Sequence, residues 1–362
     1  MKNIQKIIQS YLTQVVAEEK ERGIQVAVYY EGELIVNAYA GYADLARKKL
    51  ITDKTLFPVF SVGKGMAATV IHILASQGKI EYDAPLAKYW PEFGVKGKKN
   101  ITVRQVLNHT AGLQNMPKGL NCKDLSHWAS MVKLIEKQKP ISVPGSQFVY
   151  HGITYSWLVG ELAQRVDGRK FSAIMDATIC QSLKIHDMYI GLPKKLDANV
   201  AILDEPNPDP EMLKTKEPHP IPAWICPLAD WMNTLPARHA CLPSSNGIMT
   251  AHAIARHYAA LIPGGVDGIE LLPRKSVKLA TQKQKQNDGT SFHRGLGYSL
   301  GGEKSSIYGP RVSAFGHGGY GGSVGFADPH HKFAVGLTKN FFSKENTSGL
   351  IVKKIREIIQ SK

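Results

Sequence analysis

The spacing of apolar residues changes along the chain, from strand-like to helical and back to strand-like. Residues 24–41, IQVAVYYEGELIVNAYAG, crowd β-branched and aromatic side chains on both sides of Glu31-Gly32, which predicts two strands joined as a hairpin. In the middle of the chain, apolar residues recur with the spacing of one helix face. Helices are therefore predicted over residues 63–77, 103–107, 125–138 and 153–166.

The carboxyl-terminal part returns to an alternating pattern. From about Arg311, glycines alternate with apolar residues up to a break at Asp328-Pro329, which predicts two more strands before an amphipathic helix over residues 348–360. Strands at both ends around a helical middle predict an α+β fold, in which an antiparallel sheet flanked by helices carries an all-helical insertion. We expect the active site to lie between a discontinuous sheet domain and a mainly helical domain with long loops, comprising residues 1–60 with 285–362 and residues 61–284 respectively.

Charge and composition narrow the functional classes. The chain has 362 residues, with 45 Lys and Arg against 30 Asp and Glu, and a formal net charge of +15. This excess of positive charge attracts anionic substrates or surfaces. The basic residues are scattered and accompany no nucleic-acid-binding motif, so no nucleic-acid partner is predicted.

Cysteine and histidine spacing predict neither a structural metal nor a disulfide framework. The four cysteines show no CxxC pair and no regular spacing, so a reducing, cytoplasmic setting is expected. No segment approaches eighteen consecutive apolar residues, and the amino terminus is amphipathic, which predicts neither membrane spanning nor secretion. No cofactor is predicted, because metal-ligand spacing is lacking among His109, His239, His252 and His257.

The first candidate catalytic residues are Ser61 and Lys64. They lie three residues apart in the segment FPVFSVGKGMAATVIHIL, residues 57–74, at the start of a predicted helix. Residues at this spacing share a helix face, so the Lys64 amine can reach the Ser61 hydroxyl, and burial would lower its pKa towards that of a useful base. The alternative is a serine N-cap followed by a solvated lysine. The two residues alone leave both interpretations open.

Two later segments extend the pattern. SVGK (61–64), PGSQFVYHGITYSWLVGEL (144–162) and GHGGYGGSVGFADP (316–329) occur in this order, and ITVRQVLNHTAGL lies between the first two. Together they resemble the three motifs of the serine β-lactamase and penicillin-binding-protein superfamily, on the side of class C β-lactamases and related esterases. The resemblance implies the β-lactamase/transpeptidase fold.

The resemblance also implies a set of roles. Ser61 would be the nucleophile that forms an acyl-enzyme, with Lys64 and Tyr150 accepting its proton and returning it to the leaving group. The backbone N–H groups of Ser61 and Tyr320 would form the oxyanion hole. The strand residues Gly318 and Gly319 would let substrate approach closely. Because neither lysine nor tyrosine has an ordinary pKa near 7, we expect Lys64 and Tyr150 to titrate as a coupled pair, with a charged lysine lowering the pKa of the tyrosine.

Two departures from the superfamily motifs bear on the substrate. Gly152 stands where β-lactamases have an asparagine, and His317 stands where they have a lysine that helps to hold a substrate carboxylate. Strong β-lactam hydrolysis is therefore not expected, and a carboxylesterase acting on small or medium esters, or on thioesters, is predicted. His317 is expected to contact substrate, whereas His151 either contacts substrate or packs structurally.

Other interpretations stay open. An acyltransferase would use the same residues, with an acceptor pocket that we would seek in the long loop 204–227, and a non-catalytic scaffold would keep only the fold. Ser323 lies in a GxSxG pattern, but a turn and a strand follow it rather than the helix of an α/β-hydrolase. The overlapping GxGxxG pattern comes late in the chain, with no crossover helix after it.

Overall fold

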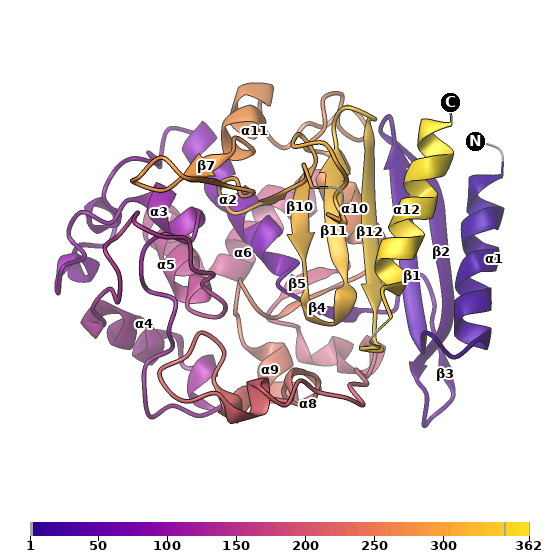
Figure 1. Ribbon diagram of the computed structural model, residues 1–362, viewed down its shortest axis with the longest axis horizontal. Helices are drawn as coiled ribbons and strands as arrows, with labels where there is room; N and C mark the ends of the chain where they lie inside the picture. Colours follow the sequence, from indigo (N-terminus) through magenta and orange to yellow (C-terminus); the bar gives the residue numbers. More distant parts are fainter. Residues whose placement is uncertain (1–2, 304, 344, 362) are drawn as a thin grey trace.

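A computed structural model describes residues 3–303, 305–343 and 345–361. Its main feature is a sheet of seven strands in the order β3-β2-β1-β12-β11-β10-β9, in which all neighbouring strands are antiparallel (Figure 1). These strands are β1 (Gly23–Tyr30), β2 (Glu33–Asp44), β3 (Lys49–Leu50), β9 (Ser299–Leu300), β10 (Phe315–Gly318), β11 (Val324–Asp328) and β12 (Phe333–Lys339).

The two ends of the chain meet in the centre of this sheet. β1 and β2 form the predicted hairpin, and β1 pairs on its other side with β12, from Ile24 opposite Lys339 to Tyr30 opposite Phe333. The predicted α+β fold, with an antiparallel sheet built from both chain ends, is confirmed.

Helices cover both faces of the sheet. α1 (Ile4–Ala17) and α12 (Thr347–Gln360) bury their apolar faces against one side, in a core that includes Ile8 and Ile355 (Figure 1). α10 (Ala251–Ala259) lies on the other side, so close that a side chain at Gly336 of β12 would collide with the Ala251 carbonyl. α10 belongs to the segment 61–284 that the sequence assigns to the helical domain, yet it packs on the sheet, because its apolar residues face β1 and β12.

The remaining elements form the helical part of the molecule and two small sheets. The helices are α2 (Gly63–Ser76), α3 (Val103–Leu107), α4 (Trp128–Lys137), α5 (Tyr155–Asp167), α6 (Phe171–Met175), α7 (Gln181–Leu183), α8 (Leu228–Met232), α9 (Leu235–His239) and α11 (Arg274–Ala280). β4 (Phe57–Phe60), β5 (Met188–Ile190) and β6 (Gly247–Met249) form a sheet in the order β4-β6-β5, and β7 (Gln284–Lys285) pairs with β8 (Ser291–Phe292).

The structure differs from the predicted elements at several places. The single strand predicted before Asp328 is divided into β10 and β11, because Gly321 and Gly322 have φ angles of 81° and 101° and turn the chain. The short strands β5 and β6 interrupt the predicted helical middle. α4 begins at Trp128, after a 3₁₀ turn over Asp124–Ser126, and not at Leu125.

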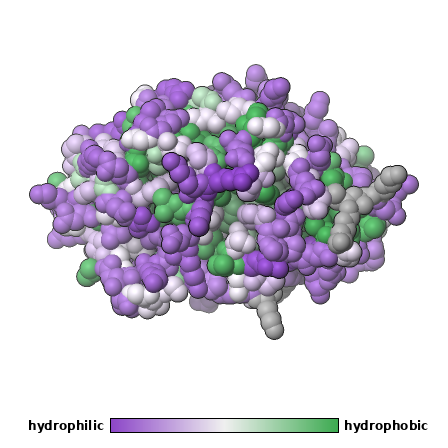
Figure 2. All heavy atoms as spheres, turned by 90° about the horizontal axis from the view of Figure 1, so that it is seen from above, coloured by the Kyte–Doolittle hydropathy of each residue, from purple (hydrophilic) through white to green (hydrophobic). Residues whose placement is uncertain are grey.

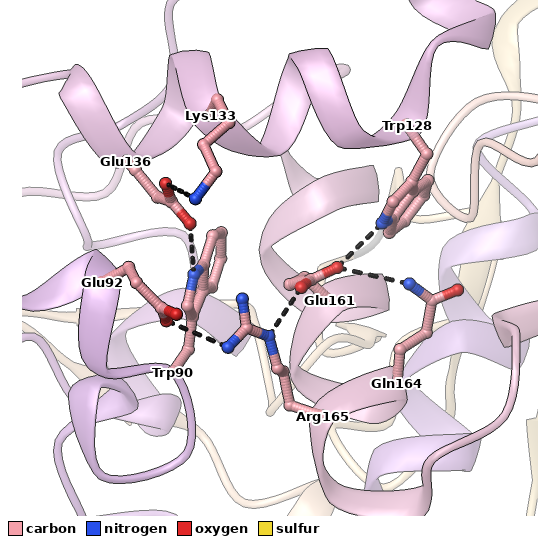
Figure 3. Close-up of polar contacts among 8 residues, drawn as sticks. All are labelled: Trp90, Glu92, Trp128, Lys133, Glu136, Glu161, Gln164 and Arg165. Carbon is pink, nitrogen blue, oxygen red and sulfur yellow. Dashed lines mark hydrogen bonds and ion pairs between the residues drawn. The ribbon is translucent and has the colours of Figure 1, made fainter.

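A network of hydrogen bonds and ion pairs connects α4 and α5 in the helical part of the molecule (Figure 3). Glu161 of α5 accepts hydrogen bonds from the Trp128 indole at 2.8 Å and from Arg165 at 2.7 Å. Arg165 also donates to Glu92 at 2.9 Å, and the Trp90 indole donates to Glu136 of α4 at 2.9 Å. The network therefore joins α4, α5 and the 3₁₀ turn Pro91–Gly94.

The surface is mostly hydrophilic on the face seen in Figure 2, with hydrophobic residues in small separate groups. Among the described residues, no helix combines the length and the apolar character that crossing a membrane requires.

Candidate active site

Ser61 lies at the junction between β4 and α2. The preceding residue, Phe60, has a φ angle of +47°, which is uncommon for a bulky side chain and turns the chain sharply from strand to helix. Gly319, which follows β10, packs so closely on β4 that a side chain there would collide with the Val59 carbonyl. This contact places the third motif beside the serine.

Two side chains contact the Ser61 hydroxyl. The Nζ atom of Lys64 lies 3.1 Å from Ser61 Oγ, and the Tyr150 hydroxyl donates to the same oxygen at 3.0 Å. Lys64 comes from the first turn of α2, while Tyr150 comes from the loop before α5, 89 positions after Ser61. The fold thus brings together the serine, lysine and tyrosine that the sequence singles out.

Lys64 is fully buried and has no carboxylate partner among the described residues. Its Nζ donates to the carbonyl oxygens of Gly152 at 2.8 Å and Ser244 at 2.7 Å. Burial, and secondarily the positive charge of Arg294, lowers the pKa of Lys64 well below its ordinary value. The environment therefore favours a neutral amine.

Tyr150 shows the opposite shift. Burial raises its pKa to about 12, although its hydrogen bond with Ser61 and the charge of Arg294 act to lower it. Desolvation is the largest influence on the pKa of both groups, and the coupled titration of Lys64 and Tyr150 stays a prediction. The ring is held by His109, whose centroid lies 4.8 Å away, and Lys64 Nζ lies 4.8 Å from the ring centroid.

Ser61 lines a cavity of about 360 Å³. One part of its wall is apolar and comes mainly from the loop 204–227 and α8, with Phe60 of β4 and Ile153 before α5. The other part includes Gly318, at the end of β10, and several polar side chains. The apolar residues are Phe60, Ile153, Ile221, Ile225, Leu228 and Trp231, and the remaining lining residues are Ser61, Tyr150, Gly152, Ser245, Arg294, Ser299, Tyr308, His317, Gly318, Gly319 and Tyr320.

The two candidate histidines have different surroundings. His317 lines the cavity, its Nδ1 lies 2.7 Å from the Gly318 carbonyl, and its buried Nε2 has no partner among the described residues. Burial, together with the charges of Arg294 and Lys64, lowers its pKa well below 6.5, so the ring is neutral near pH 7. His151 does not line the cavity. Its ring nitrogens contact the backbone N–H of Leu113 and the carbonyl of Val149, which favours the packing alternative.

Gly152 has a steric reason to lack a side chain. A Cβ atom there would lie 3.2 Å from Ile221 Cγ1 and 3.2 Å from the Pro220 carbonyl oxygen. Pro220 and Ile221 of the loop 204–227 thus leave little room for a side chain at this position. Ile221 of this loop instead presents an apolar surface to the cavity.

Sequence reasoning missed two residues of the site. Ser244 supplies the carbonyl that Lys64 contacts, and its hydroxyl donates to the Gly152 carbonyl at 3.0 Å. Arg294 lines the cavity, with its guanidinium carbon 5.6 Å from the centroid of the Tyr150 ring. Neither residue belongs to a motif, so no local signal indicated them.

Ser323 and three of the other histidines do not line this cavity. Ser323 is buried at the start of β11, where its hydroxyl accepts a hydrogen bond from the Lys339 N–H at 3.3 Å, and a strand follows it. Three other histidines contact different partners: His239 pairs with Asp197, His252 with Tyr29 and His257 with Thr69.

The chain is similar to known proteins in both sequence and structure. A model of the beta-lactamase family matches residues 8–352. The chain is 32% identical over 343 residues to esterase/beta-lactamase LipL of Mycobacterium tuberculosis. This alignment covers 88% of the chain and 77% of LipL. It is similar to the crystal structure of a family VIII carboxylesterase, with 29% identity, a TM-score of 0.86 and coverage of 98% and 97% of the two chains. A penicillin-binding protein homologue from Caulobacter crescentus matches with 31% identity, a TM-score of 0.84 and coverage of 96% and 95%. The chain therefore belongs to the beta-lactamase family.

Proposed function

We propose that this protein is a serine carboxylesterase that forms an acyl-enzyme on Ser61. The observation that carries the proposal is the placement of Ser61 Oγ within 3.1 Å of Lys64 Nζ and 3.0 Å of the Tyr150 hydroxyl, at the wall of a cavity. The names of its relatives support ester chemistry, since LipL is called an esterase/beta-lactamase and a structural relative is a family VIII carboxylesterase.

Lys64 is the general base of the proposed acylation. A neutral amine has two N–H groups and one lone pair. The carbonyl oxygens of Gly152 and Ser244 accept the two N–H groups, so the lone pair faces the Ser61 hydroxyl. As Ser61 Oγ forms a bond to the substrate carbonyl carbon, its proton moves to Lys64 Nζ.

Two backbone N–H groups are suited to stabilise the resulting oxyanion. Both Ser61 and Tyr320 line the cavity, and no hydrogen bond in the turns and loops of the described chain uses either N–H group. Donors fixed in this way stabilise charge that develops only in the transition state. Removing one such donor typically raises the barrier by about 2.7–4 kcal/mol.

Tyr150 is the general acid of the proposed mechanism. Its raised pKa keeps the hydroxyl protonated, and it already donates to Ser61 Oγ. When the C–O bond to the leaving group breaks, Tyr150 gives its proton to the departing alkoxide, and the Lys64 ammonium then gives a proton to the Tyr150 phenolate. In deacylation, water attacks the acyl carbon and gives a proton to Lys64. As the bond between the acyl carbon and Ser61 Oγ breaks, Lys64 returns that proton to Ser61, and the carboxylic acid product leaves.

The cavity supports small or medium esters as substrates. A volume of about 360 Å³ and an apolar wall from Ile221, Ile225 and Trp231 suit a short acyl or alkoxy group. Thioesters meet the same requirements. The reducing, cytoplasmic compartment that we also propose is supported by the free thiols of all four cysteines.

Hydrolysis of p-nitrophenyl butyrate by matched serine variants tests this function. Ser61→Ala is expected to abolish turnover, whereas Ser323→Ala keeps most of it, because only Ser61 has a base within hydrogen-bond distance. If Ser323→Ala removed the activity and Ser61→Ala did not, the proposed nucleophile would be wrong.

A further inference from the structure

We propose that Arg294 makes the cavity selective for esters that carry an anionic group, such as a carboxylate. This inference rests on the proposed esterase function and specifies its substrate class. It derives from an arginine that forms no ion pair with a described residue and that lines the same cavity as the nucleophile.

Arg294 is held in a fixed position at the cavity wall. It lies between β8 and β9, where its backbone pairs with that of Ser299 and its Nη1 donates to the Ser299 hydroxyl at 2.5 Å. Its guanidinium carbon lies 5.5 Å from the centroid of the Phe148 ring and 5.6 Å from that of Tyr150. Two rings and one hydroxyl thus orient a group that has five N–H donors.

No carboxylate of the described chain neutralises this charge. Arg104, Arg165 and Arg256 each form an ion pair with an aspartate or glutamate, but Arg294 takes part in none. No Asp or Glu is among the residues that line the cavity. A partly buried guanidinium with free donors is a strong site for a planar, bidentate anion.

Arg294 also gives the cavity wall a positive charge. Among the described residues that line the cavity, it is the one with a permanent charge, because His317 is neutral near pH 7. Its charge reaches the neighbouring groups, since it contributes to the lowered pKa values of Lys64 and His317. The apolar wall at Ile221 and Trp231 has no such charge. A substrate with one apolar and one anionic part therefore matches the cavity.

Two pairs of esters test this inference. p-Nitrophenyl hemiglutarate and p-nitrophenyl butyrate differ by a carboxylate on the acyl side, whereas 4-butyryloxybenzoate and phenyl butyrate differ by one on the leaving-group side. We expect the wild-type enzyme to prefer the anionic ester in at least one pair, and Arg294→Met to reduce that preference in kcat/KM by about tenfold or more. Arg294→Lys, which keeps the charge, should retain part of it.

The control is Arg47→Met, which removes the same charge from a side chain that is 86% exposed and distant from the cavity lining. It should leave the preference unchanged. The inference is overturned if Arg294→Met slows neutral and anionic esters equally in both pairs, which would indicate an effect on Lys64 and Tyr150 alone. It is equally overturned if Arg47→Met removes the preference.

Binding of glutarate separates this inference from the esterase proposal, because it requires no turnover. Calorimetry should give a Kd for Arg294→Met at least about tenfold above those of the wild type and Arg47→Met. Equal affinities would refute the anion site even if ester hydrolysis is observed. A selective loss in Arg294→Met would support the site even if no ester is hydrolysed.

Discussion

Lys64 Nζ lies 3.1 Å from Ser61 Oγ and makes shorter contacts, of 2.8 and 2.7 Å, with the carbonyl oxygens of Gly152 and Ser244. Two carbonyls and one hydroxyl around a buried amine suit the neutral form, which donates twice and accepts once. This arrangement assigns the base of the proposed reaction to the lysine.

The pH dependence of hydrolysis tests this assignment. Only neutral Lys64 accepts a proton, so kcat/KM for p-nitrophenyl butyrate should rise with pH through the pKa of Lys64 and then level off. Because that pKa is well below its ordinary value, the plateau extends towards neutral pH. Arg294→Met removes a positive neighbour, so it should raise this pKa and move the acid limb to higher pH. A limb that stays in place or moves to lower pH would contradict the assignment.

Tyr150 and Tyr308 form a matched pair of tyrosines in the cavity wall. Only Tyr150 donates to Ser61, so Tyr150→Phe should lower kcat by about 10²-fold or more, as expected for loss of a general acid. Tyr308→Phe should have a much smaller effect. Steady-state kinetics on p-nitrophenyl butyrate measure both, with circular dichroism to confirm folding. Equal losses in the two variants would argue against a proton-transfer role for Tyr150.

The missing asparagine predicts a preference for esters over β-lactams. Wild-type kcat/KM should be far higher for p-nitrophenyl butyrate than for penicillin G. Gly152→Asn should not create penicillin hydrolysis, because its Cβ would lie 3.2 Å from Ile221 Cγ1 and displace the loop 204–227. Efficient penicillin hydrolysis by either protein would contradict this account of the site.

The polar network of Figure 3 is predicted to stabilise the fold without acting in catalysis. Glu161→Ala would leave the Trp128 indole N–H and the Arg165 Nε–H without their acceptor, while Arg165 keeps its ion pair with Glu92, so the cost in the free energy of unfolding should be about 1–3 kcal/mol. Glu81→Ala is the control, because Glu81 pairs with Lys88 on the exposed surface and should cost far less. Urea denaturation measures both. Similar losses, or a selective loss of kcat in Glu161→Ala, would refute this role.

Much of the fold could be predicted because it depends on local patterns. The hairpin around Glu31-Gly32 follows from two β-rich segments and a turn, and α3 matches its predicted range at Val103–Leu107. The three-residue strands β5 and β6 were missed, since so short a segment shows no period. The turn at Gly321 was missed because its glycines also fit a continuous alternating strand.

The residues of the site could likewise be predicted only where they lie in local motifs. Ser61, Lys64 and Tyr150 lie in motifs and could be selected from the sequence. Arg294 could not, because its importance comes from tertiary contacts with Phe148 and Tyr150, more than 140 positions away. The directions of the pKa shifts also required the structure, since burial decides them and burial depends on the whole fold.

Identification of the nucleophile by mass spectrometry is the most direct test of the proposed function. A fluorophosphonate probe reacts with an activated serine in a single step and forms a stable adduct. We predict one adduct on the peptide that contains Ser61, in the wild type and in Ser323→Ala, and none in Ser61→Ala. An adduct on Ser323, or the absence of any adduct from the folded wild-type protein, would contradict the account of Ser61 as a nucleophile activated by Lys64.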